Sequence, residues 1–384
     1  MDYSAFFEPL HPGWADVLAA QAAPETLGRH TWAHVSGSHF PDWEAADLLI
    51  LGCGAGEDLS AEAIREQFYR LTLPHEELRI ADLGNLRPKE SPDAMAEMLA
   101  YVAGGLIRAG KTVLLLGGDS TVAWGQYLSY ESLGRQCEYV HVSPRLCLED
   151  SDLRFDKSSV NHKIIHHRPG YLFQMTNLGY QRYFVRASEL AMLKEAHHGV
   201  LRYGDIAGQI SQAEPPLRTA DIVCLDLTSL RFADAPGSAD PSPGGFSVME
   251  FCRLARYAGM GYHVNSLSIT GLRTENDLRS QTALLGAMAL WYFIEGYYNR
   301  WDDYPLDDRS NMRQYTVEMR AGMETIRFYT HLVTGRWWME VPFQDSMGRD
   351  PARSRLVACA ESDYEAARRD EVPELWWMIF NKLT

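Results

Sequence analysis

Short apolar runs rich in Leu, Ile and Val alternate with helix-length segments along most of this chain, and this alternation constrains the fold most. A strand, a helix and a further strand of the same sheet require a right-handed crossover, which yields parallel strands covered on both faces. The sequence therefore predicts a three-layer α/β/α sandwich with an eight-stranded, mainly parallel sheet, in which ligands bind beyond the carboxyl ends of the strands. The eight predicted strands are Ala46–Leu51, Leu78–Ala81, Thr112–Leu116, Glu138–Val142, Gln181–Val185, Gly199–Arg202, Asp221–Asp226 and His263–Ile269.

The pattern changes after residue 298, where the alternation gives way to segments interpreted as helical and to aromatic clusters. We expect an N-terminal extension over 1–45, an α/β domain over 46–298 and a helical C-terminal extension over 299–384. The extension carries the triplet Trp-Trp-Met twice, at 337–339 and 376–378. Because Trp is mostly buried or at interfaces, we expect these indoles to pack the extension on the sheet domain rather than to form a separate ligand site.

The chain is acidic, with 36 Lys and Arg against 51 Asp and Glu among 384 residues. This charge repels phosphate backbones, so nucleic acid is not an expected partner. The longest apolar run, Ala283–Ile294, is too short to cross a bilayer, and no membrane association is expected. A start without a positive segment and six Cys without CxxC spacing favour reduced thiols and a cytoplasmic location.

Two motifs follow predicted strands. Gly117–Thr121 (GGDST) comes after a buried strand and opens a helix, which alone indicates no more than a tight turn with an Asp cap. A Pro/Gly-rich stretch, Ala235–Phe246, begins nine residues after Asp226. The two motifs in this order resemble those of the ureohydrolase family (arginase, agmatinase, formimidoylglutamase), and the resemblance extends from about Ala46 to Tyr298.

The resemblance implies an arginase-like fold and, in active members, two Mn²⁺ ions held by two His and four Asp side chains, with a bridging hydroxide that attacks a guanidinium or formimino carbon. This sequence departs from that pattern at most of the ligand positions. Ser120 stands where a GGDHS motif has His, beside a retained Asp119. Asp226 keeps the first Asp of a later motif, but Thr228 replaces the second. The segment 143–147 aligns with a DAHxD motif and lacks all three of its ligands.

Retained scaffold motifs with lost ligands are typical of a pseudoenzyme, so we expect a metal-free pocket at the former metal site and no cofactor. We assign no catalytic residue and no metal ligand. Gly271 aligns with a substrate-positioning acid of the family, so that carboxylate is absent too. The predicted pocket residues are Asp119, Ser120, Ser143, Arg145, Cys147, Asp226 and Thr228, and the bordering loop contributes Pro236, Gly237, Gly244 and Gly245.

The functional hypothesis is a catalytically degenerate ureohydrolase-like protein that acts by binding or assembly. A small guanidino or formimino-type ligand and a homo-oligomer are implied by the resemblance alone. The alternative is an active metal-dependent C–N hydrolase of the arginase or formimidoylglutamase type with relocated ligands, which would require Mn²⁺. A third possibility is a structural subunit that pairs with an active paralogue.

The sequence offers candidate ligands for two other metal sites. His162 and His166 are spaced i, i+4, which is compatible with zinc on one helix face, but no third ligand lies nearby, and a solvated His-rich segment is favoured. Asp119, Cys147 and Asp226 could converge on one soft metal, but Arg145 would place a cation among them.

Arg145 occupies the middle of the former DAHxD motif, and we predict that its guanidinium pairs with Asp226 in place of the lost metal charge. The alternative is that the side chain of Arg145 extends to solvent. We also predict that the loop from Pro236 to Gly245 is ordered and borders the pocket, because its prolines restrict φ.

Overall fold

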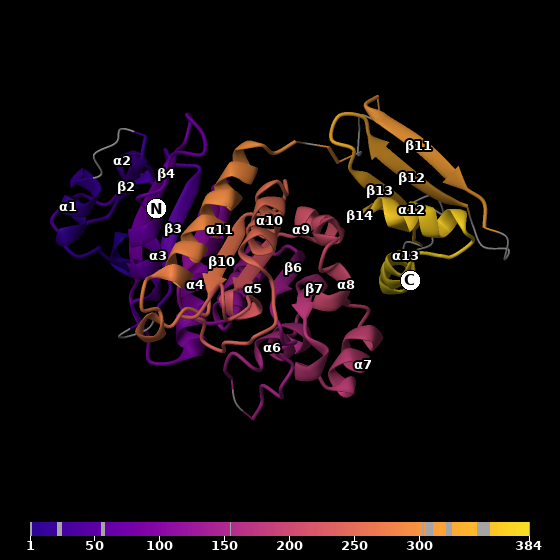
Figure 1. Cartoon of the computed structure of the whole chain (residues 1–384), viewed down its shortest axis with the longest axis horizontal. Helices are drawn as coiled ribbons and strands as arrows, with labels where there is room; N and C mark the ends of the chain where they lie inside the picture. Colours follow the sequence, from indigo (N-terminus) through magenta and orange to yellow (C-terminus); the bar gives the residue numbers. More distant parts are fainter. Residues whose placement is uncertain are drawn as a thin grey trace.

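The structure, a computed structural model, describes residues 2–383 apart from 21–24, 55–57, 154, 302, 305–309, 320–324 and 344–353. Its main sheet has ten strands in the order β1-β4-β3-β5-β10-β9-β6-β7-β8, with β2 paired to β4 (Figure 1). Only β1 runs antiparallel to its neighbour among the described pairs of this sheet. The strands are β1 (Phe7–Glu8), β2 (Thr31–Ala33), β3 (Leu48–Gly52), β4 (Ile80–Leu86), β5 (Thr112–Leu116), β6 (Cys137–Val142), β7 (Leu172–Tyr180), β8 (Gly199–Arg202), β9 (Ile222–Asp226) and β10 (Ser266–Thr270).

Helices cover both faces of this sheet and create two hydrophobic cores. Successive residues of a strand point to opposite faces, so Leu114 of β5 enters one core and Leu115 the other. The first core contains apolar residues of α3, α10 and α11, and the second contains those of α4, α5 and α6. The predicted three-layer α/β/α fold with a mainly parallel sheet is therefore confirmed. The sheet has ten strands rather than the predicted eight, because β1, β2 and β7 were not predicted and residues 181–185 were wrongly counted as a strand. The helices are α1 (Gly13–Ala20), α2 (Leu27–His30), α3 (Ser60–Phe68), α4 (Pro92–Arg108), α5 (Val122–Leu133), α6 (Val160–His166), α7 (Ala187–Glu195), α8 (Tyr203–Ile206), α9 (Glu214–Thr219), α10 (Val248–Gly259) and α11 (Gln281–Tyr298).

Local sequence explains where the long helices begin. Ser91 caps α4 by accepting a hydrogen bond from the backbone N–H of Ala94, and Pro92 occupies the first turn, where its missing N–H costs nothing. Ser247 and Glu250 form a reciprocal capping box at the start of α10. None of the described helices is long and apolar enough to cross a membrane.

One predicted strand, Gln181–Val185, is wrong. The strand of this region is β7, and residues Arg182–Phe184 form a 3₁₀ turn after it. Polar residues Gln174, Thr176 and Asn177 are buried in β7, where they pair in parallel with β6. The strands were predicted from apolar runs, and these polar residues interrupt the run in β7, so the strand was not predicted.

The sequence predicted a helical C-terminal extension, and this prediction is wrong. The extension forms a four-stranded antiparallel sheet in the order β11-β12-β13-β14, followed by two helices. A core formed by Phe328, Met339, Trp376 and other apolar residues lies between this sheet and the helices. Aromatic and β-branched side chains at alternate positions favour strands. The sequence prediction assigned these segments to helices instead. The elements are β11 (Met312–Val317), β12 (Ile326–His331), β13 (Trp337–Pro342), β14 (Ser354–Cys359), α12 (Glu361–Arg368) and α13 (Glu374–Leu383).

This C-terminal unit lies beside the end of the main sheet that carries β7 and β8 (Figure 1). Arg218 of α9 joins the two, because its guanidinium lies 4.3 Å from the centroid of a Trp338 ring and donates a 3.0 Å hydrogen bond to the carbonyl of Trp337. Arg336 adds ion pairs to Glu214 at 3.2 Å and to Asp303 at 3.0 Å. The first Trp-Trp-Met triplet thus lies at the contact between the units.

Candidate functional site

The candidate site lies at the carboxyl ends of β5, β9 and β10, which are neighbours in the sheet. After β5 the chain turns at Gly117 and Gly118, whose φ values of +86° and +72° suit residues without a side chain. The carbonyl of Gly118 accepts a 3.0 Å hydrogen bond from the N–H of Gly271, which follows β10. This contact brings the turn after β5 next to Asp226, the last residue of β9.

Asp226 is buried, with 7% of its surface exposed, and its partners are neutral groups. The Ser120 hydroxyl donates to one carboxylate oxygen at 2.9 Å, and the Thr228 backbone N–H donates to the other at 2.9 Å. Burial raises the pKa of Asp226 above its usual value, while hydrogen bonds from Thr228 and Ser120 and the charge of Lys157 act in the opposite direction. Three positions of the predicted pocket therefore lie together.

The backbone of Gly271 packs against the carboxylate of Asp226. A Cβ at Gly271 would lie 2.5 Å from Oδ1 of Asp226, and the φ of Gly271 is +83°. Any side chain there would clash with Asp226, and an acid would also add a like charge. Glycine at position 271 is thus matched to the position of Asp226.

The remaining predicted pocket residues are arranged differently. Asp119 is turned to its own loop, where Oδ1 accepts hydrogen bonds from the N–H and the hydroxyl of Thr121 at 2.9 and 2.6 Å. Cys147 has a φ of 53°, and burial and the charge of Asp226 raise the pKa of its thiol, which keeps it protonated. Ser143 is buried and accepts a 3.3 Å hydrogen bond from the N–H of Arg145.

The predicted pairing of Arg145 with Asp226 is wrong. The guanidinium of Arg145 forms an ion pair with Asp240 at 3.0 Å and lies 4.1 Å from the centroid of the Phe184 ring. Both partners of this pair are about half exposed, at 44% and 46% of their side-chain surfaces. The Pro/Gly-rich loop supplies Asp240, so the loop, rather than the end of β9, determines where this cation lies.

The Pro/Gly-rich loop is tied to the scaffold by backbone hydrogen bonds. The N–H of Gly237 donates to the Thr282 hydroxyl at 2.8 Å, and the N–H of Ala239 donates to the carbonyl of Gly271 at 2.8 Å. Gly245 has a φ of +146° and is crowded by the backbone of residues 229–231. The loop therefore lies against Gly271, the residue in contact with Asp226.

These strand ends, turns and loop occur together in a known family. A sequence profile described as Arginase family matches residues 53–295. The chain belongs to the arginase family. A search of curated proteins gives no match.

Solved structures of the arginase family share the fold at low sequence identity. A formiminoglutamase from Trypanosoma cruzi, solved with Mn²⁺, matches with a TM-score of 0.60 and 16% identity over 69% of this chain and 97% of that one. An agmatinase from Burkholderia thailandensis, described as hypothetical, gives 0.57 and 16% over 67% and 87%. An arginase from Bacillus subtilis gives 0.54 and 17% over 64% and 98%. At such identities these matches show the fold alone.

The donor atoms at the strand ends do not fit a pair of Mn²⁺ ions. Hard divalent cations bind carboxylate and imidazole groups, and two of them require several such ligands. Here Asp226 is accompanied by hydroxyls and a protonated thiol. Within the described ranges, no group of three or more His, Cys, Asp and Glu side chains is arranged to hold a metal ion.

His162 and His166 lie on one face of α6, as their spacing predicts, with ring centroids 4.1 Å apart. The ring Nδ1 of His162 accepts a hydrogen bond from the N–H of Ser151 at 3.3 Å, and the Nδ1 of His166 lies 2.9 Å from the carbonyl of His162. These contacts orient the rings toward backbone groups of their own segment.

A buried polar layer beneath the site was missed by the sequence analysis. His141 of β6 is fully buried, and burial lowers its pKa to about 3, so the ring is neutral. Asn161 contacts its Nδ1 at 3.0 Å, and Asn177 donates to the carbonyl of Arg145 at 3.1 Å. Tyr139 Oη, His141 Nε2 and the side-chain oxygens of both Asn residues are buried without a partner in the described chain. The alternating polar residues Tyr139, His141 and Ser143 were the available signal.

Proposed function

We propose that this arginase-family chain has lost two-metal hydrolysis and acts by binding or assembly. The observation that carries the proposal is the environment of Asp226, where the Ser120 hydroxyl and the Thr228 N–H occupy the two carboxylate oxygens. A single carboxylate supplies too few of the oxygen ligands that a hard divalent cation requires in exchange for its water.

The replaced positions support the same reading. Hydroxyls of Ser120 and Thr228 stay protonated at neutral pH and are weak ligands for a hard cation. Without several carboxylates in one place, the site no longer needs a metal to offset their mutual repulsion. The fold is thereby retained with a network at the strand ends in which uncharged groups donate hydrogen bonds to Asp226.

A small guanidino or formimino-type ligand at this site is part of the proposal, and it rests on membership of the arginase family alone. Assembly as a homo-oligomer, or with an active paralogue, is the second part. Sedimentation of the purified protein, alone and mixed with an active family member, tests that part directly.

The deciding experiment combines metal analysis with an activity assay. The full chain is purified with Mn²⁺ in all buffers, dialysed, and analysed for metal beside the variant Asp226→Asn. We expect both proteins to hold only background Mn²⁺ and to release no urea or formamide above the buffer rate from arginine, agmatine or formiminoglutamate.

One or more Mn²⁺ per chain, lost in Asp226→Asn, together with a turnover abolished by chelator, would replace the proposal by the alternative of an active C–N hydrolase with relocated ligands. Arginase-family enzyme handled in the same buffers serves as the positive control for both the metal content and the assay.

A further inference from the structure

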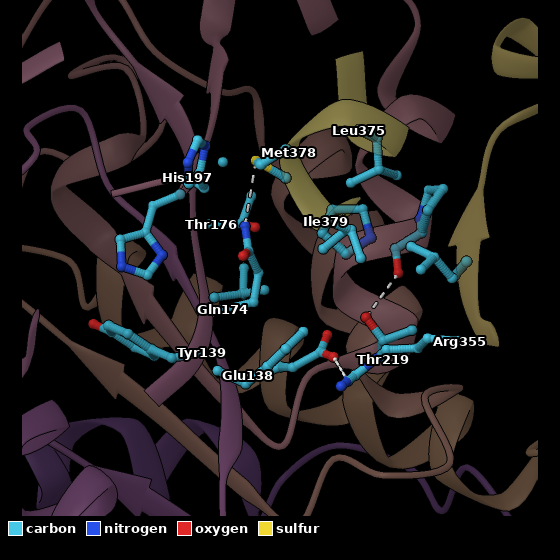
Figure 2. Close-up of a pocket in the computed structure, with 18 of the residues that line it drawn as sticks. Glu138, Tyr139, Gln174, Thr176, His197, Thr219, Arg355, Leu375, Met378 and Ile379 are labelled. Atoms are coloured by element: carbon cyan, nitrogen blue, oxygen red, sulfur yellow. Dashed lines mark hydrogen bonds and ion pairs between the residues drawn. The ribbon is translucent and has the colours of Figure 1, made fainter. Parts of the chain in front are cut away.

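A cavity of about 1230 Å³ lies between the main sheet and the C-terminal unit. We call it the interface cavity; Figure 2 shows residues that line it. At the edge of the main sheet, Gly199–Leu201 of β8 line the cavity. The lining residues of β6 and β7, such as Glu138 and Gln174, lie within the first four residues of β6 and the first five of β7. In parallel strands these positions lie toward the edge opposite to the carboxyl ends, so the cavity is separate from the site around Asp226.

One wall of the interface cavity is apolar. Leu375, Met378 and Ile379 of α13 line it and occupy the same region of Figure 2. Their spacing of three and four residues places them on one face of the helix. The side-chain amide of Gln174 lies 3.6 Å from the sulfur of Met378, so the wall is in contact with the sheet. This wall suits the hydrocarbon part of a ligand.

The guanidinium of Arg355 lines another part of the interface cavity and has hydrogen-bond donors left for a ligand. Arg355 of β14 donates from Nη2 to Glu138 at 2.7 Å, and its guanidinium lies 3.7 Å from the centroid of the Phe173 ring. A guanidinium carries five N–H donors, and among the described residues only this one hydrogen bond from Arg355 is found. The side chain is 35% exposed, so the remaining donors can reach a ligand in the cavity.

The charges around Arg355 favour an anion. Lys382 lies close by, with its Nζ 2.6 Å from the side-chain oxygen of Gln174 and 3.1 Å from Nδ1 of His198. Burial lowers the pKa of Lys382 to about 7, while the charge of Glu138 opposes this shift and that of Arg355 reinforces it. An entering anion would hold a proton on this amine.

The acidic side chains of the lining are mostly engaged. Asp221 forms an ion pair with Arg135 at 2.7 Å, and Asp363 accepts the N–H of Ala360 at 2.8 Å. Glu374 is exposed in the first turn of α13. The acids therefore do not create a site for a cation at the Arg355 end.

We propose that the interface cavity binds an amphipathic monocarboxylate, with its carboxylate on the free donors of Arg355 and its hydrocarbon part against Leu375, Met378 and Ile379. A planar guanidinium held from behind by an aromatic ring and a carboxylate is oriented in advance for a bidentate contact. The proposal goes beyond the function proposed above, because it stands on residues remote from the strand ends.

The test is calorimetric titration of the full chain with decanoate and with decylamine, which share the hydrocarbon part and differ in charge. We expect decanoate to bind at least about tenfold more tightly than decylamine, because a charge-assisted hydrogen bond contributes that much. Arg355→Gln should weaken decanoate at least about tenfold. Met378→Trp, which fills the apolar side, should weaken both ligands.

The matched control is Arg327→Gln, since Arg327 belongs to the same small sheet but pairs with Glu340 at 3.4 Å and does not line the cavity. It should leave both affinities unchanged. If Arg355→Gln does not fold because Glu138 is left unpaired, the double variant Glu138→Gln, Arg355→Gln removes both charges and should lose decanoate in the same way. Absence of decanoate binding, equal affinity for the amine, or affinity that survives both the charge and the Trp variants would overturn the proposal.

Discussion

Two buried aspartates, Asp82 of β4 and Asp226 of β9, differ in how their carboxylates are stabilised away from water. Asp82 is fully buried and lies 2.7 Å from Nε of Arg65, with a further hydrogen bond from the hydroxyl of Tyr69 at 2.5 Å. Among the described residues Asp226 forms no ion pair; its carboxylate is held by the Ser120 hydroxyl and the Thr228 N–H, and the charge of Lys157 acts on it without such a contact.

The difference shows which partners each buried carboxylate depends on. An ion pair removed from water depends on both partners, so loss of the Arg65 charge leaves an uncompensated carboxylate. A carboxylate with neutral donors can take up a proton instead, and the raised pKa of Asp226 reflects that option. The predictions below test this contrast.

The largest expected effect is that of Arg65→Met. The guanidinium donates to Asp82 and also to the carbonyl of Gly84 at 3.0 Å, and its side chain is fully buried. We expect a loss of about 3–5 kcal/mol in the free energy of unfolding, measured by urea denaturation. Arg70→Met, which breaks an exposed pair with Glu66, should change stability by less than about 1 kcal/mol. Similar losses for both variants would contradict the assigned role of the buried pair.

A smaller effect is expected for Ser120→Ala. The variant leaves Oδ2 of Asp226 without its hydroxyl donor in a buried place. We expect a loss of about 1–3 kcal/mol in the free energy of unfolding at neutral pH, and less at a pH where Asp226 is protonated. Thr121→Val, at a hydroxyl that bonds to Asp119 rather than Asp226, is the comparison. A loss for Ser120→Ala that does not depend on pH would argue against a role through the Asp226 charge.

The next prediction concerns the pH dependence of Asp226→Asn. Because the folded-state pKa of Asp226 lies above 3.8, the native protein holds this proton more tightly than the unfolded chain does. Stability is therefore lost as pH rises from 3.8 through the raised pKa, and the Asn variant escapes this loss. Urea titrations from about pH 3 to about pH 7 should show the variant gaining relative to wild type as pH rises. A constant difference would mean that burial does not govern this group.

The smallest effect is expected for Arg145→Met. Its ion pair with Asp240 is about half exposed, and such pairs contribute less than about 1 kcal/mol. Thermal unfolding of the variant should be close to that of wild type, and more so at high salt. A loss as large as that of Arg65→Met would place Arg145 in a buried network after all.

Much of the main domain could be predicted because its signals are local. The strands β3, β5 and β9 are apolar over nearly their whole length, and the glycines at 117 and 118 mark a turn that only residues without side chains adopt easily. β7 was missed because its buried polar residues carry no apolar signal. The small sheet at the C-terminus was missed because aromatic residues fit both strands and buried helices.

The sequence by itself determined the α/β order and the motifs that place Asp226 at a strand end. Only the tertiary structure decided which groups meet across the chain. Arg145 pairs with Asp240, 95 positions away, on the Pro/Gly-rich loop. Gln174 contacts Met378, 204 positions away, and both residues line the interface cavity. The physical reason is that local patterns fix backbone conformation within a few residues, whereas ion pairs and cavities depend on distances that packing alone sets.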